Sequence, residues 1–250
     1  MSRFLSPFGP PPVRKRNLFA HVVEELGVRI MRGDLQPALP FPKEADLGRE
    51  FDVSRSVIRE TVKSLAAKGL VESRTGTGIR VLAPIHWNLL DAEVLDWRYR
   101  VMPRARFFDE LFEIRLMIEP RAAALAAQRA SAAEIAEIAG AYEAMAAERK
   151  SDGTAIDEDL HFHRAILNAA RNALLLQMGS LIGVGLFISH QISSESFRVF
   201  LPRHKKVLDA IAARASSEAE DAMRRLLTET YKFMTRHLLE PSQQEEWLKV

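Results

Sequence analysis

The stretch that decides the fold is Phe41–Val81, FPKEADLGREFDVSRSVIRETVKSLAAKGLVESRTGTGIRV. The Pro-Lys-Glu triplet at 42–44 is typical of a helix start, and a short apolar-periodic segment of about three turns continues to Phe51. Ser54 then offers a hydroxyl group that can cap a second helix. The stretch therefore predicts two helices joined by a tight turn.

The second of these helices has two distinct faces. At about 100° per residue, its apolar side chains fall on one side and its basic side chains, four residues apart, on another. The apolar set is Ile58, Val62, Leu65 and Ala66, and the basic set is Arg55, Arg59 and Lys63, with Ser56 beside it. This layout is typical of a DNA recognition helix. The alternative is a solvated charged face, because charge stripes are common on protein surfaces.

A small hairpin is expected after this helix. Lys68-Gly69 is a helix stop, and the runs 70–74 and 79–82 have the composition of short strands around the glycine-rich segment 75–78. A glycine-rich hairpin with basic flanks can lie against a phosphate backbone or enter a minor groove. Helix, turn, helix and hairpin together predict a winged helix-turn-helix.

The same stretch closely resembles the DNA-binding domain of the gluconate-repressor (GntR) superfamily of bacterial transcription regulators. The resemblance implies DNA contacts from the start of the second helix and a glycine at the tip of the wing. The matching positions are Ser54, Arg55, Ser56, Val57, Arg59 and Gly76, and Lys63 extends the basic stripe. Ala45 stands where the family usually has an arginine, so one DNA contact and the operator preference are left open.

Composition limits the remaining possibilities. The chain has 250 residues, 47% of them hydrophobic, which is enough for a substantial core in one or two domains. The lack of cysteine excludes disulfides, thiolate metal sites and cysteine nucleophiles. No apolar run reaches about 18 residues, and the N-terminus lacks the apolar core of a signal peptide, so we expect a cytoplasmic protein with no membrane partner.

Charge divides the chain into two parts. Residues 1–83 carry 14 Lys and Arg against 9 Asp and Glu, whereas the remainder carries 21 against 24. A basic first third fits a DNA-binding module joined to a part that does not bind DNA. We expect a flexible arm at 1–16, a DNA-binding domain at 17–83, a linker at 84–104, a helical domain at 105–240 and a tail at 241–250.

Helical patterns dominate the second part, which predicts a mainly α protein with a C-terminal antiparallel helical bundle. Pro120 should kink or divide the first of these helices, Asn172 and Pro202 should mark helix starts, and Ser217 with Glu220 fits a capping box. The expected helices are 105–130, 132–149, 155–170, 173–196, 203–214 and 217–239.

Two histidines and an aspartate in the bundle are candidate metal ligands. Asp159 and His163 are four residues apart and therefore project from one helix face, whereas His161 points elsewhere. His204 shares an apolar face with Val207, Leu208 and Ile211. The alternatives are a surface pair for the first two and a hydrogen-bonded core histidine for His204.

Arg115 also falls on an apolar helical stripe, with Glu119 one turn further on. An isolated buried charge is very costly, so this arginine needs a partner. Either Glu119 neutralises it, or it receives an anionic ligand, since its planar fork can bind a carboxylate through two hydrogen bonds.

The strings FEIRLMIEPRAAALAA, DLHFHRAILNAARN and RHKKVLDAIAAR resemble the FCD effector-binding domain of the fatty-acid-regulator (FadR) branch of this superfamily. That resemblance implies a divalent metal, zinc first with nickel or manganese as alternatives, held by Asp159, His163 and His204. It also places Arg115 near the effector pocket. Leu226 stands where the family has a fourth ligand histidine, so the site has three ligands or is completed by His190, Glu195 or His237.

The expected protein is a homodimeric, metabolite-responsive transcription regulator, a repressor that reads a palindromic operator. The run WNLLDAEVLDW is similar to the linker of sugar-acid-responsive members, which favours a carboxylate effector such as a sugar acid. The alternative is a metal-dependent hydrolase or lyase with a DNA-binding appendage. We rank it lower, because no carboxylate can be assigned as a general base near the metal ligands.

Overall fold

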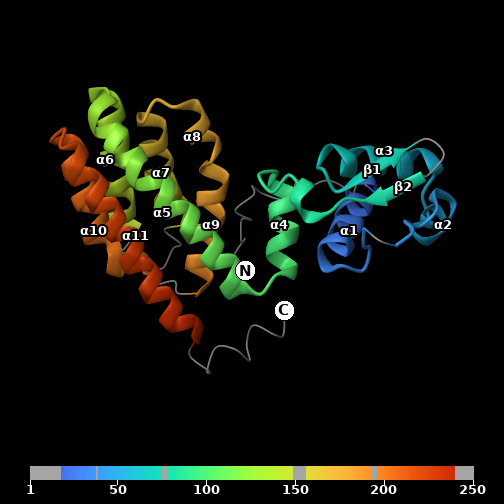
Figure 1. Cartoon of the computed structure of the whole chain (residues 1–250). Helices are drawn as coiled ribbons and strands as arrows, with labels where there is room; N and C mark the ends of the chain where they lie inside the picture. The colour runs from blue at the N-terminus through green and yellow to red at the C-terminus, as the bar shows by residue number, and fades with distance from the viewer. Residues whose placement is uncertain (1–17, 38, 75–77, 149–155, 193–195, 240–250) are drawn as a thin grey trace. The chain divides into compact units, whose positions relative to one another are not determined.

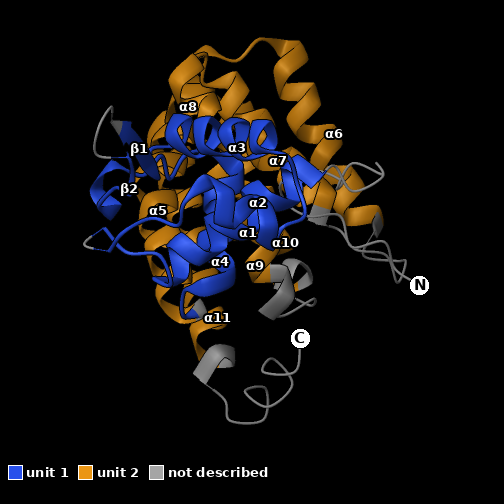
Figure 2. Ribbon diagram, turned by 90° about the vertical axis from the view of Figure 1, so that its right-hand side faces the viewer, with its two compact units in different colours: residues 1–104 blue, residues 105–250 orange. Residues whose placement is uncertain are grey.

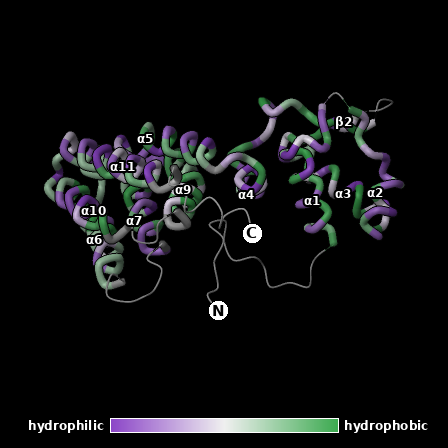
Figure 3. The backbone as a smooth tube through the Cα atoms, turned by 90° about the horizontal axis from the view of Figure 1, so that it is seen from below, coloured by the Kyte–Doolittle hydropathy of each residue, from purple (hydrophilic) through white to green (hydrophobic). Residues whose placement is uncertain are grey.

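The computed structural model describes residues 18–37, 39–74, 78–148, 156–192 and 196–239 of the chain (Figure 1). The chain divides into two compact units, residues 1–104 and 105–250 (Figure 2). In both units, hydrophobic and hydrophilic stretches alternate along the helices (Figure 3), as expected of helices that bury one face. Within the described ranges, no helix is both long enough and apolar enough to cross a membrane.

The first unit contains the expected winged helix-turn-helix. Its elements are α1 (Leu18–Arg32), α2 (Glu44–Glu50), α3 (Arg55–Ala67), β1 (Val71–Arg74) and β2 (Gly78–Val81). Ser54 caps α3, because its Oγ accepts a hydrogen bond from the Val57 amide. Gly69 ends the helix with a positive φ of 74°, and the two strands pair antiparallel with Val71 opposite Val81. The predicted sequence of cap, helix, stop and hairpin is confirmed, although α2 has only seven residues.

Tertiary packing changes one detail of α3. Ile58, Val62 and Leu65 are buried as predicted, but Ala66 is exposed and Thr61 is buried in its place. The buried stripe of α3 therefore includes Thr61, and the helix packs against α1. The apolar face of α1 is buried at Val22, Val23, Leu26 and Ile30.

The segment that follows the wing is part of this first unit. It forms a short 3-10 turn, η1 (Pro84–His86), and a helix, α4 (Ala92–Val101), which packs against α1. Val94 and Trp97 lie in the core of the unit. Lys68, at the end of α3, pairs with Asp91 at 2.8 Å and with Glu93 at 2.7 Å. We therefore expect α4 to move together with the recognition helix.

Gly27 provides a test of this packing. A Cβ atom at this position would lie 2.4 Å from the indole ring of Trp97, so Gly27→Ala should force the ring to shift. We expect the free energy of unfolding to fall by about 1–3 kcal/mol, as is usual for an overpacked core. The matched control is Gly140→Ala in the second unit, where nothing lies within 4 Å and alanine should stabilise the helix by roughly 0.5–1 kcal/mol. Urea unfolding of both variants measures the difference, and equal stabilities would contradict the close Trp97 contact.

The second unit is helical throughout its described residues, as predicted. Its helices are α5 (Arg104–Arg129), α6 (Ala132–Glu148), α7 (Ile156–Ala169), α8 (Ala173–Gln177), α9 (Gly179–Ile192), α10 (Ser196–Ala212) and α11 (Ser216–Leu239). The core brings together alanines of α5 with larger apolar residues of α7, α9, α10 and α11. Ser131 and Glu134 form the capping-box contacts that start α6, and Asn172 caps α8.

Three predicted helix boundaries are wrong. The helix expected at 173–196 breaks at Met178, whose amide bonds back to the Leu175 carbonyl at 3.0 Å and closes a tight turn before Gly179. Pro202 does not start α10 but lies inside it, because burial of Phe200 and Leu201 holds the preceding turn in place. The capping box at Ser217 is not formed, since α11 begins at Ser216. Of the two effects predicted for Pro120, a kink or a division of the helix, the division is absent, because α5 continues through it.

Candidate functional site

The predicted DNA-contacting residues gather at the start of α3. Ser54, Arg55, Ser56 and Arg59 are exposed there, and Val57 is half-buried. Lys63 continues the basic stripe two turns along the helix. Arg59 pairs with Glu44 at 3.1 Å and Lys63 with Glu60 at 2.8 Å. Exposed pairs of this kind contribute only about 0–1 kcal/mol, so DNA phosphates can compete for both cations.

Two other positions concern the DNA-binding prediction. Gly76, the expected wing tip, lies outside the described residues. Ala45 is the second residue of α2 and its side chain is exposed.

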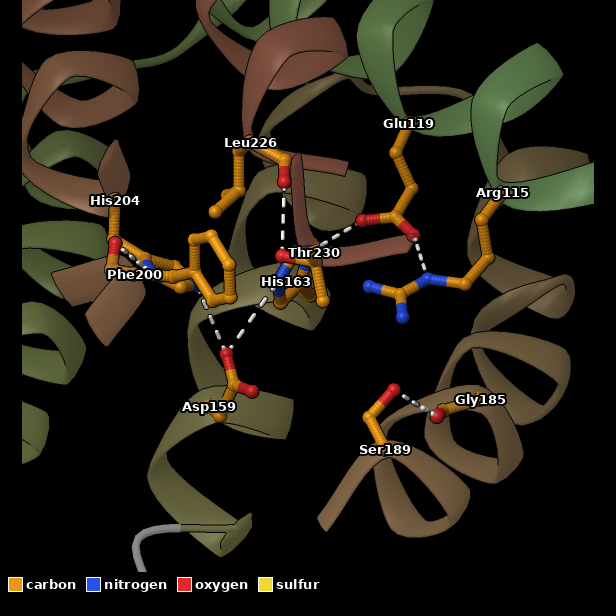
Figure 4. Close-up of polar contacts among 10 residues, drawn as sticks. All are labelled: Arg115, Glu119, Asp159, His163, Gly185, Ser189, Phe200, His204, Leu226 and Thr230. Carbon is orange, nitrogen blue, oxygen red and sulfur yellow. Dashed lines mark hydrogen bonds and ion pairs between the residues drawn. The ribbon is translucent and has the colours of Figure 1, made fainter. Parts of the chain in front are cut away.

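The three candidate metal ligands meet inside the second unit. Asp159 and His163 project from α7 and His204 from α10, and one ligand atom of each lies within 4.8 Å of the others (Figure 4). Both histidines are buried. Asp159 Oδ1 is 3.4 Å from His163 Nε2 and 3.1 Å from His204 Nε2. The helical spacing therefore correctly placed Asp159 and His163 on one face, and His204 faces them from a second helix.

Hydrogen bonds on the far sides of the rings orient both imidazoles. His204 Nδ1 lies 3.0 Å from the Phe200 carbonyl and can only donate to it. His163 Nδ1 contacts Glu119 Oε2, which as a carboxylate oxygen can only accept. In the neutral rings, both Nε2 lone pairs then point toward Asp159. Two imidazole nitrogens and a carboxylate oxygen therefore converge on one point, which requires a proton or a metal cation between them. This donor set fits a divalent transition metal.

Arg115 and Glu119 extend this polar cluster. Both side chains are only 2% exposed, and Arg115 Nε donates to Glu119 Oε1 at 2.6 Å. Of the two roles considered for Arg115, the internal ion pair is thus present. Among the described residues, Nη1 of the same guanidinium is buried without a hydrogen-bond partner, which leaves a donor for an anionic ligand as well. Gly185 of α9 makes room for the arginine, since a Cβ there would lie 3.0 Å from Arg115 Cδ.

The charges in the cluster shift the pKa values of one another. Burial alone would raise the pKa of Glu119, but the positive charges of Arg115 and His163 outweigh it and lower that pKa to about 2. Burial would lower the pKa of His163, but Glu119 and Asp159 outweigh it and raise that pKa to about 9. Hydrogen bonds from both histidines hold the pKa of Asp159 well below its usual range, against the effect of burial. Both carboxylates are therefore ionised at neutral pH.

A cavity of about 20 Å³ joins the ligand triad to Arg115. A space of this size holds a water molecule or a single ion. Its polar lining consists of Arg115, Asp159, His163, Ser189, His204 and Thr230. The metal candidates and the effector candidate thus line one site.

The fourth ligand position is apolar. Leu226 of α11 lines the cavity, where an aliphatic side chain cannot coordinate a metal. The side chains of His190 and His237, and the whole of Glu195, lie outside the described part of the chain. Among the residues that can be described, the candidate set has three protein ligands.

Three contributions to the site were not predicted from the sequence. Ser189 and Thr230 reach the cavity from α9 and α11, and Glu119 contacts His163 as well as Arg115. Thr230 follows Leu226 by four residues, so the helical period gave a signal for it. For Ser189 and for the second contact of Glu119, we find no local signal, because both depend on how separate helices pack.

Together the two units define a class of protein: a DNA-binding transcription regulator that carries a separate small-molecule site. The chain belongs to the gntR family of bacterial regulatory proteins, whose family model matches residues 18–81, and an FCD domain model matches residues 110–229. This membership confirms the predicted class, a metabolite-responsive regulator rather than an enzyme.

Individual relatives agree with this assignment. The galactonate operon transcriptional repressor of Escherichia coli K12 is 33% identical over 80% of this chain and 90% of its own length. The uncharacterized HTH-type transcriptional regulator YieP of the same organism is 32% identical over 85% of this chain and 94% of its own. The solved structure of Lar, which controls expression of the Listeria monocytogenes agr system, shares the fold with a TM-score of 0.63, at 19% identity over 91% of this chain and all of that one.

Proposed function

We propose that this regulator is a repressor that releases its operator when a hydroxylated carboxylate binds beside a divalent cation in the second unit. The observation that carries the proposal is the unpartnered Nη1 of Arg115, which is buried beside the cavity that Asp159, His163 and His204 also line. A buried donor without a partner is costly, and a carboxylate would satisfy it.

The two hydroxyl groups at the cavity support an effector with hydroxyls of its own. Ser189 donates to the Gly185 carbonyl at 2.9 Å, and Thr230 donates to the Leu226 carbonyl at 2.9 Å. Since their protons are already used, both oxygens face the cavity as acceptors. A sugar acid is one class of ligand that brings both a carboxylate for Arg115 and hydroxyl donors for these oxygens. The name of the galactonate operon repressor is consistent with that chemistry.

Asp159, His163 and His204 would hold the cation. Two imidazole nitrogens and one carboxylate oxygen suit zinc first, with nickel or manganese as alternatives. A bound cation would supply positive charge for the carboxylate or hydroxyl oxygens of the effector. Phe200 and Glu119 fix the two imidazole rings that would hold the cation, and Leu226, which cannot coordinate a metal, lines the same cavity.

The size of the cavity suggests how the effector acts. The space of about 20 Å³ is below the usual volume of a small-molecule site, so we propose that helices around it move apart when the effector binds. An effector that favours the expanded state shifts the protein toward it. We propose that this state binds operator more weakly. Because coupling is reciprocal, operator DNA should weaken effector binding by the same factor.

We also propose that the protein acts as a homodimer on a palindromic operator. One α3 presents a single short basic face, and two copies related by a two-fold axis would read two matching half-sites. Sedimentation of the full chain tests this, since a monomer at the concentrations that bind operator would contradict it.

The function is tested by operator binding in the presence of galactonate and zinc. We expect galactonate with zinc to release the operator, and galactose, which lacks the carboxylate, to have no effect. A screen of sugar acids by thermal shift should show stabilisation that depends on the metal, because a ligand of the folded state raises apparent stability. If no hydroxylated carboxylate stabilises the protein with or without metal, the proposed effector class is wrong. Consumption of the sugar acid would instead indicate an enzyme.

Arg59→Ala tests the recognition helix. We expect operator binding to weaken by about 1–3 kcal/mol if the guanidinium reads a base. Metal binding and effector binding should be unchanged. Arg224→Ala is the matched control, since this arginine is exposed on α11 in the other unit and should not affect the operator. Fluorescence anisotropy with labelled operator measures both variants, and equal affinities would remove Arg59 from the interface.

A further inference from the structure

Glu119 contacts both halves of the site at once. Its carboxylate is only 2% exposed, and its two oxygens have different partners: Oε1 accepts from Arg115 Nε at 2.6 Å, and Oε2 accepts from His163 Nδ1 (Figure 4). Arg115 precedes it by one turn on α5, whereas His163 is 44 residues away on α7. Glu119 therefore links the guanidinium to the imidazole by direct contacts.

The contact with His163 decides which ring nitrogen faces the ligand triad. An ionised carboxylate can only accept, so Nδ1 must carry a proton and Nε2 must be the nitrogen that points toward Asp159. Outer carboxylates that hold a metal-binding histidine in this way fix its orientation and increase its basicity. The Phe200 carbonyl does the same for His204, but as a neutral acceptor.

The contact with Arg115 decides which edge of the guanidinium remains available. Nε is occupied by Glu119, and the ring of Phe112 lies 4.9 Å from the guanidinium carbon. Nη1 is the buried donor that lacks a partner. A single carboxylate thus fixes the imidazole that would face a cation and the guanidinium that would face a ligand carboxylate.

We propose that Glu119 is a positioning residue that couples cation binding to effector binding. This inference rests on the proposed function and adds a mechanism to it. With a cation at the triad, Nε2 of His163 would be drawn toward it, and the His163 ring would transmit the change through Glu119 to the guanidinium. Conversely, an effector carboxylate on Nη1 would shift the guanidinium and, through Glu119, change how firmly the His163 ring is held.

The test is Glu119→Gln, with Glu113→Gln as the matched control on the exposed side of the same helix. Arg115 and His163 bond to different oxygens of Glu119. Glutamine replaces one of these oxygens by an NH2 group, which cannot accept, so one of the two contacts is lost. Titration with cobalt(II) alone, followed by visible absorption, should show affinity lowered about 10–100-fold in Glu119→Gln, the usual cost of losing an outer carboxylate, with an altered absorption band. Glu113→Gln should match the unsubstituted protein.

The melting temperature of the metal-free protein distinguishes a positioning role from a structural one. If Glu119→Gln lowers this temperature but leaves cobalt affinity unchanged, the role of Glu119 is purely structural and the proposal is overturned. If Glu119→Gln does not fold, Glu119→Asp keeps the charge but shortens the side chain. It should then lower cobalt affinity at least several-fold, and unchanged affinity would again overturn the proposal. If the unsubstituted protein does not bind cobalt, the metal part of the proposed function fails instead.

The effector arm uses galactonate with and without cobalt. In the unsubstituted protein, cobalt should raise the affinity for galactonate, and in Glu119→Gln this enhancement should largely disappear. An equal enhancement in both proteins would show that the two sites communicate without Glu119.

Discussion

Replacing His204 by alanine is expected to abolish tight metal binding while leaving the operator affinity of the metal-free protein unchanged. His204 supplies one of three converging donor atoms, and the described residues offer no replacement for it, because Leu226 occupies the fourth position. Loss of an outer partner already costs about 10–100-fold in affinity, so loss of a direct ligand should cost more than about 100-fold. Competition with a chromophoric chelator measures the change.

The control for this variant is His161→Ala. His161 lies on α7 close to His163, but its side chain is half exposed and faces Glu137 at 3.5 Å, away from the triad. Its replacement should leave metal affinity unaltered. Operator binding should be the same in both variants without metal, because the predicted DNA-contacting residues belong to the other compact unit. A His204→Ala protein that keeps its metal would show that the cation, if any, is held elsewhere.

The sequence predicted the parts of the site that depend on helical spacing within one element. Asp159 and His163 share a face because they are four residues apart, and His204 is buried because its helix carries apolar residues on the same side. Arg115 was expected to point inward for the same reason. These predictions need only the 3.6-residue period, which is a local property.

What the sequence did not predict depends on packing between helices. Glu119 and His163 meet across 44 residues, so the second oxygen of Glu119 could not be assigned from spacing. Proline disfavours a preceding helical turn, which predicts a helix start at Pro202, yet the buried Phe200 and Leu201 keep that turn helical. Likewise, the break at Met178 divides a run that is apolar on both sides, where periodicity gives no boundary.

The recognition helix was predicted most completely because its signals are local. The Ser54 cap, the Gly69 stop and the antiparallel hairpin each follow from a few adjacent residues. By contrast, the role of α4 could not be read from composition. Trp97 occupies the space above Gly27, and only the folded arrangement of α1 and α4 brings them together.

Arg115→Met is expected to remove the effector response and to destabilise the second unit by about 3–5 kcal/mol. The substitution takes away one of the two positive charges beside Glu119, and breaking a buried ion pair usually costs this much. Glu119 would keep only His163 as a partner. Chemical denaturation measures the loss of stability, and operator release by galactonate with zinc measures the response. Arg121→Met is the matched control: this arginine is exposed on α5 and 3.6 Å from Glu220, so its loss should cost at most about 1 kcal/mol.

Combining Arg115→Met with Glu119→Gln separates the two effects of Arg115. The glutamine removes the uncompensated charge and can still accept one hydrogen bond from His163, so the double variant should be more stable than Arg115→Met alone. Its effector response should remain absent, because the guanidinium that would bind the carboxylate is still missing. Recovery of both stability and response in the double variant would show that Arg115 serves only to neutralise Glu119. Recovery of stability without the response would indicate that the Nη1 donor of Arg115, which the double variant lacks, binds the ligand.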